Sequence, residues 1–261
     1  MRTSLLALAM ALASPVQAAM VAQPLDYAVG GSKLQGMLVY DDAVATPRPG
    51  IVMAPDWFGV TPASVALAKQ IAGKDYVILV ADMYGTGVRP GNGEEAGALV
   101  GKLYADRAQL RARINGALAQ LKAQQGKAPL DGRHWGAIGF CFGGTSVLDL
   151  ARSGAAVAGV VSFHGGLKGD PAFKDDIKAR VLVLHGADDV YESPEEIAAF
   201  QQEMRQAKAD WQFVSYGGAV HCFAIPTATG AAAGCQYDER TARRAFAHMR
   251  AFFTEAFAPG Q

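Results

Sequence analysis

Residues 134–144 read HWGAIGFCFGG, a run that combines an apolar strand, a sharp turn and the beginning of a helix. The apolar part at 134–140 predicts a buried strand, and residues 145–152 have helical spacing. Glycines surround Cys141 because side chains beside so sharp a turn would collide with neighbouring backbone. The stretch therefore predicts a strand–turn–helix unit that lifts one sulfur clear of a sheet.

Apolar runs on both sides of this unit alternate with helical stretches. Further strands are predicted at residues 34–40, 50–54, 76–80, 157–163, 181–185 and 211–216. Helices are predicted from Pro62 after the N-cap Thr61, across 94–125, at 193–207 and at 238–256. Glycines at 97, 101 and 116 argue against one unbroken helix over 94–125. The alternation predicts an α/β fold, with a mostly parallel central sheet flanked by helices on both faces.

The turn around Cys141 matches the nucleophile-elbow pattern G-x-S-x-G, with sulfur in place of the hydroxyl. The N terminus of the following helix would surround the sulfur with positive dipole and free N–H groups, which favour a thiolate. The alternative is a buried structural cysteine beside glycines that only permit close packing.

Two later segments supply partners for such a nucleophile. An apolar strand runs into HGADD at residues 185–189, and GGAVH at 217–221 follows the last strand. The order nucleophile, acid, histidine is that of α/β-hydrolases, and each residue follows a predicted strand, at the edge where such sheets bind ligands. Asp188 and Asp189 are both candidates for the acid.

These motifs resemble the dienelactone hydrolase family in its cysteine-nucleophile form. The resemblance covers nearly the whole mature chain; its segments are PDWFG at 55–59, ADMYG at 81–85, GFCFGG at 139–144, SFHGGL at 162–167 and AVHCF at 219–223. It implies one α/β-hydrolase domain over residues 19–261 that hydrolyses a small ester or lactone. Cys141 would be the nucleophile, His221 the base and later acid, and Asp189 the orienting acid. Backbone N–H groups of Phe142 and Trp57 would hold the oxyanion.

The sequence departs from the family pattern at two positions. Asp56 stands where the family usually has a Glu that contacts the resting thiol; the alternative is an Asp that caps its turn. Thr86 stands where dienelactone-cleaving members place an Arg for the substrate carboxylate, so dienelactone itself is not the expected substrate. Tyr84 and His164 are candidate pocket residues, with loop packing and a structural hydrogen bond as their alternatives.

The N terminus and the cysteines predict an exported protein. Residues 1–18 have the pattern of a cleaved signal peptide: Arg2 is followed by an apolar run at 5–13, by Pro15 and by Val-Gln-Ala at 16–18. The alternative is a buried or disordered N-terminal helix. We therefore expect a periplasmic or secreted enzyme. In such a compartment Cys222 and Cys235 are candidates for a disulfide, and Cys141 is the candidate for the free thiol. The alternative is that Cys222 and Cys235 are both reduced.

Composition narrows the classes of partner. Lys plus Arg and Asp plus Glu both number 24, so the zero net charge offers no reason to expect nucleic acid or an anionic membrane. No phosphate loop, HExxH or paired CxxC motif supports a nucleotide or metal cofactor. A small-molecule ester or lactone is the expected partner; oligomeric state has no sequence signature here. Two rival functions remain: a cysteine acyltransferase or thiol peptidase on the same fold, and a non-catalytic periplasmic binding protein.

Overall fold

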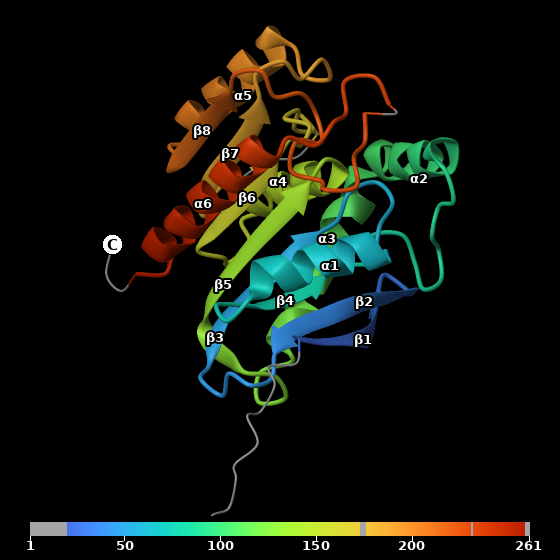
Figure 1. Ribbon diagram of the computed structural model, residues 1–261, viewed down its shortest axis with the longest axis vertical. Helices are drawn as coiled ribbons and strands as arrows, with labels where there is room; N and C mark the ends of the chain where they lie inside the picture. The colour runs from blue at the N-terminus through green and yellow to red at the C-terminus, as the bar shows by residue number, and fades with distance from the viewer. Residues whose placement is uncertain (1–19, 173–175, 231, 259–261) are drawn as a thin grey trace, which may run out of the picture.

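The computed structural model describes residues 20–172, 176–230 and 232–258, which form a sheet flanked by helices (Figure 1). The strands are β1 Met20–Val29, β2 Ser32–Asp41, β3 Arg48–Ala54, β4 Val77–Val80, β5 Leu130–Phe140, β6 Gly159–Phe163, β7 Arg180–Gly186 and β8 Trp211–Tyr216. The helices are α1 Pro62–Ala72, α2 Gly93–Ala105, α3 Arg107–Lys122, α4 Phe142–Arg152, α5 Pro194–Gln206 and α6 Glu239–Ala256. The signal peptide predicted at residues 1–18 lies outside the described residues.

The eight strands form one sheet in the order β1-β2-β4-β3-β5-β6-β7-β8. From β4 to β8 every neighbouring pair is parallel, whereas β2 is antiparallel to β4 and β1 is antiparallel to β2. The central strands are buried on both faces, which explains why they read as continuous apolar runs. The predicted α/β-hydrolase fold, with its mostly parallel sheet, is confirmed.

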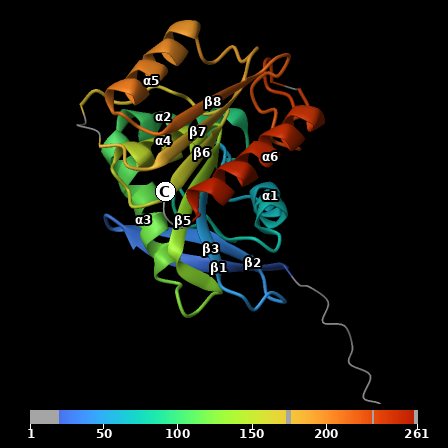
Figure 2. The same cartoon turned by 90° about the vertical axis from the view of Figure 1, so that its left-hand side faces the viewer.

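Two hydrophobic clusters lie on opposite faces of the sheet. Helices α2, α3, α4 and α5 contribute to one cluster, with side chains such as Leu103, Ile114 and Phe200. Helices α1 and α6 contribute to the other, with Leu67 and Phe253 among them. Figure 2 shows α1 and α6 on one side of the sheet and α3 and α4 on the other. Both clusters pack against the same strands, so the described residues are organised around a single sheet.

Strand β1 was not predicted, because its sequence lacks a continuous apolar run. It pairs along its whole length with β2 through the Gly30-Gly31 turn, where both residues have positive φ angles of 54° and 80°. Two strands joined by Gly-Gly are typical of a tight hairpin, and this turn chemistry was the available signal.

The long helical stretch divides into α2 and α3 at Asp106, and none of its glycines makes the break. Asp106 ends α2, and its carboxylate then accepts a hydrogen bond from the Gln109 N–H at 2.9 Å as the N-cap of α3. A short acidic side chain satisfies an otherwise unpaired N–H at a helix start, which favours a new helix over continuation of the old one. Among the described residues no helix is both long enough and apolar enough to cross a membrane.

Candidate active site

Cys141 lies between the last residue of β5 and the first residue of α4, at φ 53° and ψ −119°. Few side chains adopt such a backbone conformation, so the turn is strained and must be supported by its surroundings. A Cβ atom at Gly139 would overlap the Gly143 carbonyl, and one at Gly143 would overlap the Ala54 carbonyl. Glycine is therefore required at both positions for the turn to close, as the sequence predicts.

His164 supports the turn through a hydrogen bond to the backbone of Cys141. Its side chain is 1% exposed, and its Nδ1 accepts a hydrogen bond from the Cys141 N–H at 3.2 Å. Burial, together with the nearby charge of His221, lowers the pKa of His164 well below its ordinary value. The neutral ring can therefore keep an unprotonated Nδ1 as the acceptor. His164 does not line the pocket described below; the geometry matches the structural alternative.

The loops after β7 and β8 bring the acid and the base together. His221 Nδ1 lies 2.7 Å from Asp189 Oδ2, and the other carboxylate oxygen accepts a hydrogen bond from the Tyr191 N–H at 3.0 Å. The Asp189 side chain is fully buried, whereas Asp188 is exposed. The structure therefore pairs His221 with Asp189, the acid preferred from the sequence.

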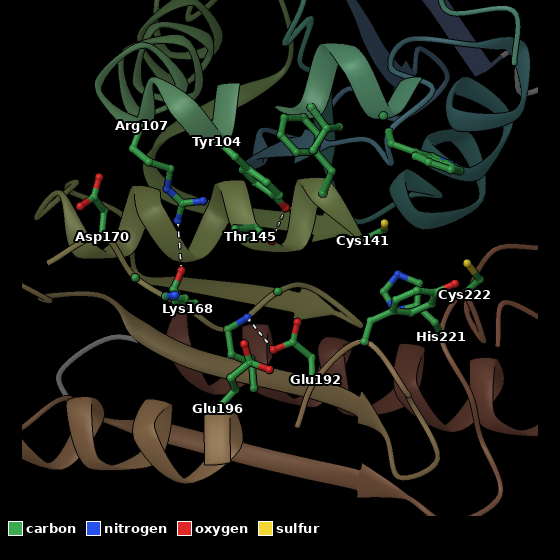
Figure 3. Close-up of a pocket in the computed structure, with 18 of the residues that line it drawn as sticks. Tyr104, Arg107, Cys141, Thr145, Lys168, Asp170, Glu192, Glu196, His221 and Cys222 are labelled. Carbon is green, nitrogen blue, oxygen red and sulfur yellow. Dashed lines mark hydrogen bonds between the residues drawn. The ribbon is translucent and has the colours of Figure 1, made fainter. Parts of the chain in front are cut away.

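His221 and Cys141 line the same pocket, and Figure 3 shows both side chains at one end of it, so the three predicted residues meet at one edge of the sheet. Burial alone would lower the pKa of His221, but the hydrogen bond to Asp189, the interaction with Cys141 and the negative charges of both raise it to about 10. An imidazole with that pKa carries a proton at neutral pH. The arrangement can thus donate a proton from His221 while the sulfur is available for attack.

A pocket of about 730 Å³ opens over Cys141 and His221. Figure 3 shows these two side chains at one end of it and Arg107 and Asp170 at the other. Both apolar and charged side chains line this pocket. The apolar ones include Trp57, Val100, Phe142, Leu167 and Tyr191. A pocket of this size and mixed character can hold a small organic molecule.

The structure places the remaining predicted residues in and behind the walls of this pocket. Trp57 and Phe142 line it, with the Phe142 N–H at the first position of α4. Tyr84 does not line it: its ring stacks on Phe142 at 5.8 Å, and its hydroxyl donates to the Trp57 carbonyl at 2.8 Å. Tyr84 thus supports both candidate oxyanion residues from behind.

Asp56 caps the turn that leads to Gly59, which is the alternative role predicted for it. Its carboxylate accepts a hydrogen bond from the Phe58 N–H at 2.9 Å, and its carbonyl accepts one from the Gly59 N–H at 3.0 Å. Burial raises the pKa of Asp56, while the hydrogen bond from Phe58 opposes that rise. Asp56 lines a separate cavity of about 120 Å³, and it is absent from the wall of the large pocket. The turn places Trp57 in the wall of the pocket that Cys141 also lines.

Cys222 and Cys235 are joined by a disulfide, and both line the pocket beside His221. The Gln236 N–H donates to the His221 carbonyl at 3.0 Å, so the end of the disulfide-closed loop is bound to the backbone of the base. Cys141 is the one free cysteine of the chain, and it is partly exposed.

Sequence analysis missed several residues of the pocket wall. Tyr104 of α2 donates a hydrogen bond to Thr145 of α4 at 3.1 Å, and Glu192 and Tyr191 enter from the acid loop. The ring of Tyr191 lies edge-on to His221 with 5.0 Å between centroids. The only sequence signal for Tyr191 and Glu192 was their closeness to Asp189, and Tyr104 carried none because its helix packs in from another part of the chain.

The sequence profile of the dienelactone hydrolase family matches residues 34–257. The chain belongs to this family. It is similar to the dienelactone hydrolase-like promiscuous phosphotriesterase P91 from metagenomic libraries, with 36% identity, a TM-score of 0.85, and coverage of 92% of this chain and 100% of P91. A structure named m3DLH has 38% identity and a TM-score of 0.85, covering 92% and 99% of the two chains.

Among curated sequences, an uncharacterized protein of Caenorhabditis elegans is 36% identical over 156 residues, which are 58% of this chain and 96% of that protein. Family membership makes this dienelactone hydrolase-like protein a hydrolase of carboxylic esters or lactones.

Proposed function

We propose that the protein hydrolyses small carboxylic esters or lactones through a Cys141–His221–Asp189 triad and a thioester intermediate. The observation that carries the proposal is that the Asp189–His221 hydrogen bond lies in the same pocket as a sulfur on a strained elbow. Nucleophile, base and orienting acid in such contact are the arrangement that covalent acyl transfer requires.

In the first step the Cys141 thiolate attacks the carbonyl carbon, and the carbonyl oxygen becomes an oxyanion. The Phe142 N–H is available because residues in the first turn of a helix lack intrahelical acceptors. The Trp57 N–H, by family resemblance, is the second donor. Each such donor contributes about 3–4 kcal/mol to stabilising the transition state.

His221 then serves two steps in succession. Protonated at the start, it donates its proton to the leaving alkoxide as the tetrahedral intermediate collapses to the thioester. Acylation removes the negative charge of the sulfur, one of the causes of the raised pKa of His221. The neutral imidazole can therefore accept a proton from water, which attacks the thioester and releases the acid and the Cys141 thiolate. Asp189 fixes the tautomer throughout.

Thr86 bears on the substrate class. It stands where dienelactone-cleaving members carry an Arg for the substrate carboxylate. The proposed substrates are therefore esters or lactones other than dienelactone, whose carboxylate would lack this partner.

Intact-mass spectrometry tests the triad mechanism. Brief exposure to an activated ester such as 4-nitrophenyl hexanoate should add one acyl group to Cys141, and the adduct should decay in water to free hexanoic acid. Decay only on addition of an amine or alcohol would indicate an acyltransferase instead. The absence of any adduct together with absence of turnover would indicate a binding protein and overturn the proposal.

Phosphotriester cleavage is a second candidate activity. P91, which is described as a promiscuous phosphotriesterase, is 36% identical to this chain over 92% of its length. The same sulfur would attack phosphorus and expel an aryloxide. Release of 4-nitrophenol from paraoxon by the wild-type chain, and its absence in Cys141→Ala, is the expected result; equal release by both would contradict it.

We also infer that the enzyme is exported, to the periplasm or outside the cell. Support comes from the signal-peptide pattern of residues 1–18 and from the disulfide between Cys222 and Cys235, a bond that persists in oxidising compartments. N-terminal sequencing of protein expressed with its leader tests this, and the mature chain should begin at residue 19.

A further inference from the structure

Glu192 is a pocket residue that the proposed mechanism does not use. It lies in the loop between the acid Asp189 and the N-cap of α5, and it lines the same pocket as Cys141 and His221. Its Oε2 accepts a hydrogen bond from the Leu167 N–H at 3.2 Å, whereas Oε1 receives none from the described part of the chain. Figure 3 shows Glu192 across the pocket from Thr145 and Cys141. One carboxylate oxygen is therefore available to a bound molecule.

We propose that Glu192 determines the charge selectivity of the site, favouring esters that carry a cationic or hydrogen-bond-donating group and disfavouring esters that carry a carboxylate. The inference rests on ester hydrolysis at Cys141. A substrate carboxylate held in a small cavity beside Glu192 would be repelled, and an ammonium group would be attracted.

The carboxylates in the pocket wall outnumber its Lys and Arg side chains: Asp170, Glu192 and Glu196 stand against Arg107 and Lys168. Arg107 is the cation deepest in the pocket wall, but its Nη2 lies 2.9 Å from the buried carboxylate of Asp149 and 3.2 Å from the Lys168 carbonyl. Its guanidinium is thus held toward the protein interior, where Asp149 also pairs with Arg111 and Arg152. Lys168 is exposed, and Asp170 beside it adds a further negative charge to that end of the pocket.

Several ionisable groups face Glu192 from the surrounding elements. They are Asp189 and His221 from the strand-end loops, Glu196 of α5, Tyr104 of α2, and Arg107, Lys168 and Asp170 around the pocket. Burial first, and then the charges of Glu196 and Asp189, raise the pKa of Glu192 to about 7, against the opposing effect of the Leu167 hydrogen bond and His221. Glu192 therefore changes from neutral below pH 7 to anionic above it.

This titration gives the selectivity a pH dependence with a defined sign. The rate for an anionic ester, relative to a neutral one, should fall as the pH rises through about 7. The relative rate for a cationic ester should rise over the same interval. His221, with a pKa of about 10, keeps its charge over this interval and so does not change these ratios.

The test compares three 4-nitrophenyl esters with acyl chains of equal length: hexanoate, the monoester of adipic acid, and 6-(trimethylammonio)hexanoate. Their charges of zero, minus one and plus one do not change between pH 5.5 and 8.5. For the wild-type enzyme we expect the adipate-to-hexanoate ratio of kcat/KM to fall about tenfold over that range, and the ammonium-to-hexanoate ratio to rise.

Variants separate selectivity from structure. Glu192→Gln keeps an oxygen for the Leu167 N–H and should flatten both pH profiles, raising the adipate ratio at pH 8.5 about tenfold. Glu192→Asp keeps the charge and should preserve the direction of both profiles. Glu195→Gln is the matched control, because Glu195 is exposed, lies three residues further on in the first turn of α5 and does not line the pocket. Its ratios should equal those of the wild type.

The outcomes distinguish this inference from the proposed function. No turnover of the hexanoate ester would refute ester hydrolysis itself. Turnover of hexanoate with wild-type ratios that are flat with pH would refute the role of Glu192 alone. If Glu192→Gln fails to fold, the pH dependence of the two wild-type kcat/KM ratios still tests the inference. Equal changes in Glu195→Gln would show that the effect is a general one of surface charge, and would also refute the inference.

Discussion

At the scale of single residues, the sulfur of Cys141 is the group on which turnover depends. Cys141→Ala should abolish ester hydrolysis and thiol labelling while changing the melting temperature little, because the β-carbon and the turn glycines are retained. A 4-nitrophenyl ester assay with thermal unfolding checks both. Cys141→Ser is the companion variant; its hydroxyl needs more help from His221, so weak activity is expected. Substantial hydrolysis by Cys141→Ala would contradict the assignment.

The two adjacent acids of the loop after β7 should behave differently. Asp189→Asn should lower kcat/KM by about 10²- to 10⁴-fold, because an amide cannot hold His221 in the required tautomer. Asp188→Asn, at an exposed position one residue earlier, should change kcat/KM by less than about twofold. Steady-state kinetics of the pair settle the choice of acid. A larger effect for Asp188→Asn would mean that the acid is wrongly assigned.

Glu192 should also make stability depend on pH. Its pKa in the folded chain is raised to about 7, mainly by burial, so the folded state binds this proton more tightly than the unfolded state. The contribution of the group to stability is therefore lost as the pH rises from about 4.3 through about 7. Glu192→Gln should raise the free energy of unfolding by about 1–2 kcal/mol at pH 8 and leave it unchanged near pH 4.5.

Denaturant titrations at the two pH values measure this difference, with Glu195→Gln as the control. An equal effect of Glu192→Gln at both pH values would show that packing, and not charge, is responsible.

At the scale of elements, the loop between Cys222 and Cys235 depends on its disulfide. The bridge links residues 13 positions apart and holds one end of the loop against His221. Replacing both cysteines with Ala should lower stability by about 3 kcal/mol in the chain-entropy model. Turnover should fall as well, because the base is less firmly placed. Unfolding and ester kinetics of the double variant provide the measurement.

Thiol counting on denatured, non-reduced mature protein accompanies that experiment. One free thiol, mapped to Cys141, is the expected result. Three free thiols after periplasmic expression would contradict the bridge.

At the scale of the whole molecule, two hydrophobic clusters share one sheet, so residues 19–261 should unfold as a single unit. Ile114→Ala on α3 and Phe253→Ala on α6 remove buried side chains from opposite faces. Each should destabilise the protein by about 2–5 kcal/mol, and each should shift the same single transition. Calorimetry of both variants tests this. Two separate transitions, each sensitive to one variant only, would indicate two domains.

How far the sequence alone predicts this molecule depends on the range of the interactions involved. The central strands, the helix caps at Thr61 and Ser193, and the elbow at Cys141 arise from patterns within a few residues. Strand β1 is different, because it lacks a continuous apolar run and is held by its partner β2. Its Gly30-Gly31 turn is the local pattern that indicates the hairpin.

By itself the sequence determined the α/β-hydrolase sheet, the order of nucleophile, acid and base, and the glycines around Cys141, because burial periodicity and backbone sterics are local. Only the tertiary structure decided that Asp189 rather than Asp188 meets His221, that Asp56 closes a turn, and that Tyr84 and His164 lie behind the pocket. It also decided that Glu192 enters the pocket. The direction of a loop side chain depends on segments far away in the chain, whose packing leaves no trace in the residues beside it.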